Sequence, residues 1–132
     1  EIQMLRCIEC SWGAEFYAVQ PLAAESVVVK HRYSAMVNPE FDTLLKRRGI
    51  RSLLLTGVAT DTCVESTGRD AYFMDYYVSI VADCCGAASA SDHLGALERF
   101  DRDYGAIVTA DAVIEAWQRV PPIPKARVDI AG

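Results

Sequence analysis

Residues 52–64, which read SLLLTGVATDTCV, indicate the fold more clearly than any other stretch of the sequence. The apolar run at residues 52–57 lacks the alternation of a half-exposed strand, which is typical of a strand buried in a parallel sheet. A helical pattern follows at about residues 63–76, where Gly68 and Ala71 provide a small face for close packing. We therefore predict a strand that leads through a short turn into a helix.

Similar units recur on both sides of this stretch. Apolar and β-branched runs predict further strands at residues 26–29, 78–81 and 106–108. Strands that alternate with helices of about ten to fifteen residues are typical of a parallel sheet with helices on both of its faces. We therefore expect one α/β domain over residues 1–132.

Capping residues mark where the helices begin. Asn38 before Pro39 predicts one helix start, and Ser89 opens a capping box that predicts a second. Either Thr109 or Asp111 would cap a last short helix. An extended arm is expected at the prolines that follow it, Pro121, Pro122 and Pro124.

The composition excludes several classes of protein. Of the 132 residues, 52% are hydrophobic and 23% are charged, a balance that excludes a disordered chain. The net charge of −5 argues against a general nucleic-acid binder, which needs clustered Lys and Arg for phosphate contacts. No apolar run reaches the roughly 18 residues of a membrane-spanning helix. We expect neither a nucleic acid nor a membrane as a partner.

The cysteines indicate a reducing compartment. Their number is odd and their spacing irregular, unlike a secreted disulfide framework, so we expect a cytoplasmic protein. The first residues lack the basic start and long apolar stretch of a signal peptide, and the chain begins with Glu1, which suggests a fragment or a trimmed chain. Cys7 and Cys10 could form a redox pair or half a zinc site, but no second pair at similar spacing is present, which favours two loop cysteines. The other three are Cys63, Cys84 and Cys85.

Cys63 and Lys30 are the strongest candidates for chemistry. Parallel α/β sheets place their sites at the carboxyl ends of the strands, and both residues follow predicted strands. A cysteine at a strand-to-helix turn lies at the positive end of a helix dipole, which favours the thiolate, and a lysine nearby adds positive charge. Unpaired backbone N–H groups in such a turn can receive an oxyanion. The alternative is that Cys63 is a small buried apolar residue, as many free cysteines are.

Several segments together resemble a known family. They are residues 29–35 (VKHRYSA), 55–67 (LTGVATDTCVEST) and 69–71 (RDA), with WGAE at residues 12–15 and VAD at residues 81–83. Over about residues 11–117 the chain resembles the isochorismatase-like cysteine hydrolases, and within them most closely the ureidoacrylate and biuret hydrolase branch.

The resemblance implies a fold and a set of site residues. The family has a three-layer α/β/α fold with a Rossmann-like, mostly parallel sheet and uses an Asp-Lys-Cys triad. Carried over, Cys63 is the nucleophile and Lys30 the triad lysine. The family's cis peptide bond maps to Val58 and Ala59, and the N–H groups of Ala59 and Cys63 would form the oxyanion hole. Trp12, Tyr33 and His31 could line the substrate pocket, or they could serve core packing or the surface.

The chain departs from the family pattern before Lys30. The triad aspartate belongs to an N-terminal segment that nothing here resembles, so we expect a domain that lacks its first strands and a chain that alone hydrolyses poorly. Metal ligands known in the nicotinamidase branch would also lie in that segment, and we assign no metal and no cofactor.

Three interpretations of the function follow. The first is a cysteine hydrolase that cleaves a C–N bond of a small amide, ureido or carbamoyl compound through a thioester-type intermediate and works as a homo-oligomer, a dimer or a tetramer. The second is a non-catalytic remnant or structural subunit with the same fold. A nicotinamidase-like or isochorismatase-like hydrolase is the third.

Overall fold

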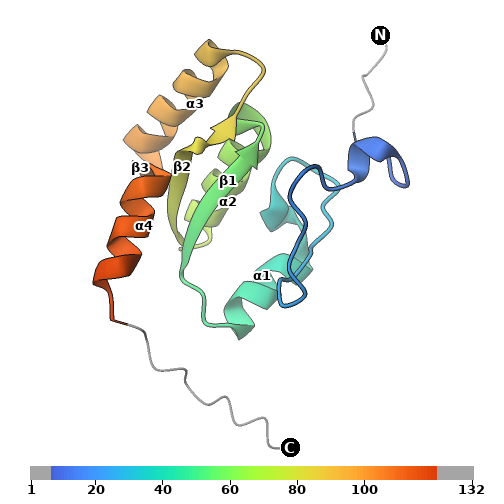
Figure 1. Cartoon of the computed structure of the whole chain (residues 1–132), viewed down its shortest axis with the longest axis horizontal. Coiled ribbons are helices and arrows are strands. Elements are labelled where there is room, and N and C mark those ends of the chain that lie inside the picture. Colours follow the sequence, from blue (N-terminus) through green and yellow to red (C-terminus); the bar gives the residue numbers. More distant parts are fainter. Residues whose placement is uncertain (1–6, 122–132) are drawn as a thin grey trace, which may run out of the picture.

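The computed structural model describes residues 7–121 of the chain, so Pro122 and Pro124 of the expected arm lie outside the described residues. The helices and strands are α1 (Pro39–Arg47), β1 (Ser52–Val58), α2 (Glu65–Phe73), β2 (Tyr77–Gly86), α3 (Ala90–Asp103), β3 (Ala106–Val108) and α4 (Ala110–Arg119) (Figure 1). Single helical turns add Trp12–Ala14, Ala35–Val37 and a π-helical turn at Thr60–Val64. Within the described residues, no helix has both the length and the apolar character needed to cross a membrane.

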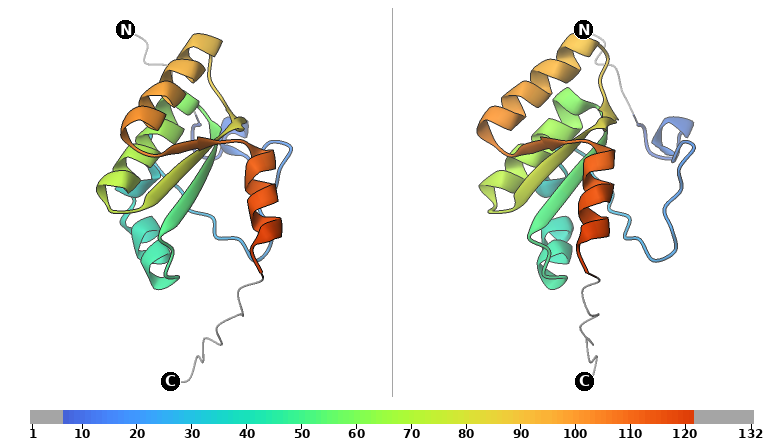
Figure 2. Two further views of the ribbon diagram at one scale, coloured as in Figure 1. Left: turned by 90° about the vertical axis from the view of Figure 1, so that its left-hand side faces the viewer. Right: turned by 60° about the vertical axis from the view of Figure 1, so that its left-hand side comes forward.

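The sheet has three parallel strands in the order β1-β2-β3. Leu55 of β1 lies opposite Ile80 of β2, and Ile80 lies opposite Ile107 of β3. Helices α2 and α3 cover one face of the sheet and α4 lies on the other (Figure 2). The parallel α/β architecture with helices on both faces is therefore confirmed.

The strand expected at residues 26–29 is wrong. This segment belongs to the loop that precedes α1 (Figure 1), and Val27 and Val29 are 55% and 67% exposed. A strand requires a partner for its backbone N–H and C=O groups. Within the described part of the chain, β1 pairs only with β2 and no strand stands beside residues 26–29. A β-branched run without such a partner remains an extended loop.

The predicted helix starts are confirmed. The Asn38 side chain accepts a hydrogen bond from the N–H of Glu40 at 2.9 Å, and Ser89 accepts one from the N–H of Asp92 at 3.1 Å. Thr109, the first of the two alternatives, caps α4.

Helix α2 ends earlier than predicted, at Phe73 rather than near Tyr76. Asp75 adopts a φ of 66°, and the N–H of Tyr76 returns to the carbonyl of Ala71 at 3.0 Å. This turn directs Tyr76 into the core, where it is 7% exposed. The apolar pattern at Tyr76 therefore reflects burial after the helix, not a further helical turn.

The core lies between the sheet and the helices α2 and α3. Ile80 of β2 and Phe100 of α3 are both fully buried. Gly68 of α2 faces the Phe100 ring, so the small face predicted on this helix is in close packing. This packing fixes the start of α2 beside the end of β1, where the candidate site lies.

Candidate active site

Cys63 lies in the turn that joins β1 to α2. The Val58–Ala59 peptide bond at the end of β1 is cis, the conformation that the family resemblance implied. The chain then forms the π-helical turn Thr60–Val64, which carries Cys63 and continues directly into α2. Cys63 is half-buried. It therefore lies at the carboxyl end of a parallel strand and at the start of a helix, where α/β folds place their sites.

Lys30 contacts the sulfur of Cys63 although it lies 33 residues earlier in the chain. Its ammonium Nζ lies 3.5 Å from Cys63 Sγ and donates a second hydrogen bond to the carbonyl of Arg32 at 3.0 Å. A positive charge beside a cysteine sulfur stabilises the thiolate, which is the nucleophilic form of the side chain. The structure thus brings together the two residues that the sequence singled out for chemistry.

Two threonines hold the turn that carries Cys63. Thr60 is fully buried, and its hydroxyl shares a 2.9 Å hydrogen bond with Nδ1 of His93 in α3. The Thr67 hydroxyl donates to the carbonyl of Cys63 at 2.7 Å. It also accepts a hydrogen bond from the N–H of Ala35 at 3.0 Å. The turn is therefore fixed both to α3 and to the segment that follows Lys30.

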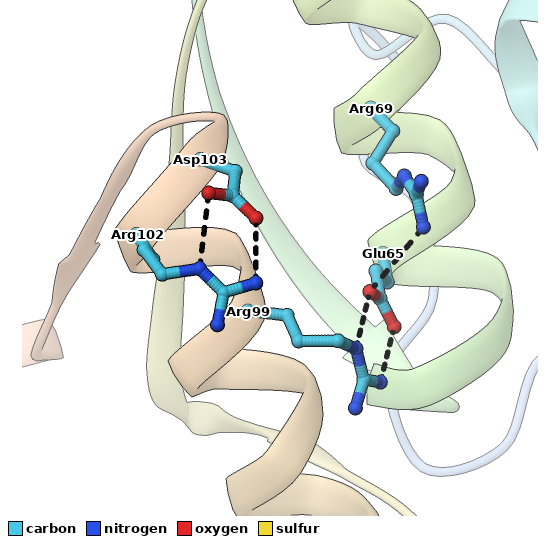
Figure 3. Close-up of polar contacts among 5 residues, drawn as sticks. All are labelled: Glu65, Arg69, Arg99, Arg102 and Asp103. Carbon is cyan, nitrogen blue, oxygen red and sulfur yellow. Dashed lines mark hydrogen bonds and ion pairs between the residues drawn. The ribbon is translucent and has the colours of Figure 1, made fainter.

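A buried carboxylate ties the first turn of α2 to α3 (Figure 3). Glu65 directly follows the π-helical turn and is 5% exposed. Arg99 of α3 donates to both of its oxygens, at 3.2 and 3.0 Å, and Arg69 lies 3.8 Å from one of them. A charge removed from water requires such pairing. The hydrogen bonds with Glu65 are the main cause that raises the pKa of Arg99, and the charges of Glu65 and Asp61 act in the same direction.

A second pair in Figure 3, Arg102 with Asp103, lies further along α3 and does not contact Glu65. Its hydrogen bonds lower the pKa of Asp103.

Carboxylates are not part of the contact between Lys30 and Cys63. Across residues 7–121, neither Lys30 Nζ nor Cys63 Sγ is hydrogen bonded to a carboxylate. Asp61 belongs to the same turn, but its Oδ1 atom is buried without a hydrogen-bond partner in the described structure. In the same part of the chain, no group of three or more His, Cys, Asp or Glu residues is arranged to hold a metal ion.

Cys85 provides an internal contrast to Cys63. It is also half-buried, and its sulfur points to the carbonyl of Leu55 at 3.9 Å. Burial raises the pKa of this thiol, and the negative charges possible at Cys84 and Asp83 act in the same direction. Cys63 and Cys85 therefore lie near the same end of the sheet in different environments, one beside a lysine and the other beside a backbone carbonyl.

The predicted pocket residues are not gathered around Cys63 by any described contact. Trp12 and Tyr33 are 79% and 65% exposed, and His31 is exposed as well. A cavity of about 770 Å³ lies instead between β1, α1 and residues 16–28, and neither Cys63 nor Lys30 lines it. The assignment of these three residues to a substrate pocket stays a prediction.

Thr67, His93 and Arg99 support the site but were not selected for it from the sequence, in which His93 was expected at the surface. One signal for Thr67 was available, because a threonine four residues after Cys63 in a helix can bond the Cys63 carbonyl. Its bond to Ala35 and the contacts of His93 and Arg99 join segments more than 30 residues apart. No local pattern encodes such contacts.

Known proteins share the sequence pattern and the fold of this chain. A model of the isochorismatase domain matches residues 3–113 of the chain. Ureidoacrylate amidohydrolase RutB of Acinetobacter baylyi is 32% identical over 127 residues, which cover 95% of this chain and 52% of the relative. The chain thus spans about half the length of this curated relative.

Two solved structures share the fold. An isochorismatase-like hydrolase from Alkaliphilus metalliredigens has a TM-score of 0.83 and 31% sequence identity, with 86% of this chain and 63% of that chain covered. N-carbamoylsarcosine amidase from Thermoplasma acidophilum has a TM-score of 0.71 and 29% identity, with 80% and 60% covered.

Proposed function

The chain belongs to the isochorismatase domain family, and from that premise we propose that it is a cysteine hydrolase acting on a C–N bond of a small amide, ureido or carbamoyl compound. The observation that carries this proposal is the 3.5 Å contact between Lys30 Nζ and Cys63 Sγ at the carboxyl end of β1. The names of two relatives support the substrate class, since one is an amidohydrolase of ureidoacrylate and the other an amidase of N-carbamoylsarcosine.

In the proposed reaction, the Cys63 thiolate attacks the carbonyl carbon and forms a C–S bond. The N–H groups of Ala59 and Cys63 hold the resulting oxyanion, for which the start of a helical turn is suited. The C–N bond then breaks, and the nitrogen leaves with a proton from a general acid. Water, deprotonated by the same group, hydrolyses the thioester to the acid and restores the cysteine. The Lys30 ammonium group, 3.5 Å from the sulfur, attracts the negative charge of the attacking thiolate.

We assign the general acid and base to a carboxylate outside the described residues, because none within them contacts Lys30 or Cys63. We further propose that Trp12, Tyr33 and His31 line the substrate pocket and that the active form is a homo-oligomer. A cytoplasmic location is supported by the five cysteines, all of which are free.

The assay measures ammonia or amine released from a ureido compound and from simple amides by the product of the complete reading frame. We expect the Cys63→Ala variant to lose activity. In Lys30→Met the rate should fall about 10²-fold or more, as is usual when a group that stabilises charge in the reaction is removed. Cys85→Ala is the matched control, and it should retain activity because Cys85 is also half-buried but its sulfur lies at the Leu55 carbonyl, away from Lys30.

Activity that survives in Cys63→Ala would contradict the proposal. Failure of the unmodified protein on every substrate class would favour the alternative of a non-catalytic subunit. Hydrolysis of nicotinamide alone would favour the nicotinamidase-like alternative.

A further inference from the structure

The hydroxyl of Thr67 connects the two segments that meet at the site. It donates to the Cys63 carbonyl at 2.7 Å and accepts the N–H of Ala35 at 3.0 Å. Thr67 is 8% exposed, so water has little access to replace either bond. The hydroxyl therefore joins the turn that carries the nucleophile to the segment that carries the lysine.

The lysine segment depends on few contacts. Lys30 is exposed, and the residues before it belong to a loop outside the sheet. The segment is held at Val29, whose carbonyl accepts a hydrogen bond from the Asn38 side chain at 2.9 Å, and at Ala35, which bonds to Thr67. Met36, which is 6% exposed, anchors the residues after Ala35 in the core. The hydrogen bond from Ala35 to Thr67 connects this segment to the turn that contains Cys63.

We propose that Thr67 is a positioning residue that sets the distance between Lys30 and Cys63 through its two hydrogen bonds, an inference that rests on the proposed function. A threonine bond to the carbonyl four residues earlier is common in helices and by itself positions nothing else. The bond from Ala35 is what distinguishes Thr67 from an ordinary helical threonine. Without the hydroxyl, the lysine segment loses its attachment to the turn, and the ammonium group moves away from the sulfur.

The test is a double-mutant cycle read by the alkylation of Cys63. Thr67→Val removes the hydroxyl at nearly constant shape, Thr67→Ser retains it, and Lys30→Met removes the ammonium group. Iodoacetamide labelling at pH 7, resolved by peptide mass spectrometry, gives the rate at Cys63 and at Cys85 in the same sample. We expect Thr67→Val to slow Cys63 about fivefold and Thr67→Ser less than about twofold, with no change at Cys85. Added to Lys30→Met, Thr67→Val should slow Cys63 no further, because coupled residues are not additive.

A second variant keeps the test decisive if Thr67→Val fails to fold. Ala35→Pro removes the N–H that Thr67 accepts, and proline suits the first position of the helical turn Ala35–Val37. Ser34 before it already has φ −78° and ψ 132°, the extended conformation that a following proline requires. We expect Ala35→Pro to reproduce the slower alkylation of Cys63.

The outcomes separate the two proposals. If Lys30→Met slows Cys63 but neither Thr67→Val nor Ala35→Pro does, the role of Thr67 is overturned and the Lys30–Cys63 site stands. If the Thr67→Val effect persists in full beside Lys30→Met, Thr67 does not act through the lysine, and the inference is again overturned. If Lys30→Met itself leaves the Cys63 rate unchanged, the proposed function fails at its central contact, and the inference fails with it.

Discussion

Gly68 shows at the residue scale how tightly α2 is held behind the site. A β-carbon at this position would lie 2.5 Å from Cε2 of Phe100 and 3.2 Å from Cδ1 of Leu55. Phe100 is fully buried, so its ring has no free space to move into, and the half-buried Leu55 of β1 lies beside it. The absence of a side chain at Gly68 is what allows the helix to approach both the sheet and α3.

We therefore predict that Gly68→Ala destabilises the protein by about 1–3 kcal/mol, the usual cost of overpacking a core. Urea denaturation measures this change in the free energy of unfolding. Gly95→Ala in α3 is the control, because its β-carbon would meet only Nη1 of Arg99, at 3.3 Å, an atom of a half-exposed side chain that does not bond to Glu65. That variant should be neutral or more stable by up to about 1 kcal/mol, since alanine favours a helix over glycine. Equal stability of both variants would contradict the close packing at Gly68.

Part of the site could be predicted from the sequence. Cys63 could be selected because the sequence shows a strand followed by a turn and a helix. The small face of that helix, Gly68 and Ala71, could be seen in the same stretch. Lys30 was selected because it follows an apolar run, although that run is not a strand. The Thr67–Ala35 bond escaped prediction because it depends on the three-dimensional path of a loop.

At the element scale, α1 is tied to the residue that precedes β2. The Tyr76 hydroxyl donates to Asp42 Oδ1 at 2.9 Å, and Lys46 donates to Asp42 Oδ2 at 2.7 Å. The hydrogen bonds from Lys46 and then Tyr76 hold the pKa of Asp42 below its ordinary value of 3.8. Since the folded protein favours the charged form, this group stabilises the fold above pH 3.8, and the contribution is lost as the pH falls through the lowered pKa.

We predict that Tyr76→Phe lowers the urea midpoint at pH 7 and that the difference from the unmodified protein narrows as the pH falls below 3.8. Protonated Asp42 no longer attracts the hydroxyl as strongly, so less is lost when the hydroxyl is removed. Tyr77→Phe is the control, because Tyr77 is 69% exposed and should show no difference at either pH. If Tyr76→Phe lowers the urea midpoint by the same amount at pH 7 and below pH 3.8, the loss comes from packing alone and the prediction is contradicted.

Helix starts could be predicted where a single capping side chain determines them. Asn38, Ser89 and Thr109 cap their helices with their own side chains, which a sequence displays directly. The apolar runs of β1, β2 and β3 are strands because each finds a parallel neighbour. Residues 26–29 have an equally suitable composition, but pairing is a property of the sheet and not of the segment.

At the scale of the whole molecule, burial is unevenly distributed. The core is formed mainly by residues of β2, α2 and α3, with single residues of α1 and of the turns before α1, α2 and β2. Residues 11–25, in contrast, are almost entirely exposed. Local stability follows the number of buried apolar contacts and protected hydrogen bonds. The cavity beside β1 is bounded on one side by this exposed segment.

Hydrogen exchange followed by mass spectrometry should therefore show the slowest exchange in β2 and α3 and the fastest in residues 11–25. Peptides from the same digest provide the comparison, so no variant is needed. Protection of residues 11–25 equal to that of β2 would contradict the distribution of burial and would place this segment in contact with another surface in solution.

Lys30 is expected to activate Cys63, and comparing the alkylation rates of the five cysteines in one chain tests this directly. Site-resolved alkylation of the folded protein by iodoacetamide at pH 7 compares Cys63 with Cys85, which is also half-buried but whose pKa is raised by burial, and with the exposed Cys7, Cys10 and Cys84. We predict that Cys63 reacts fastest of the five and that Lys30→Met removes this advantage while the other four rates stay unchanged. A Cys63 rate no higher than that of Cys85, or one that Lys30→Met leaves unchanged, would contradict the account.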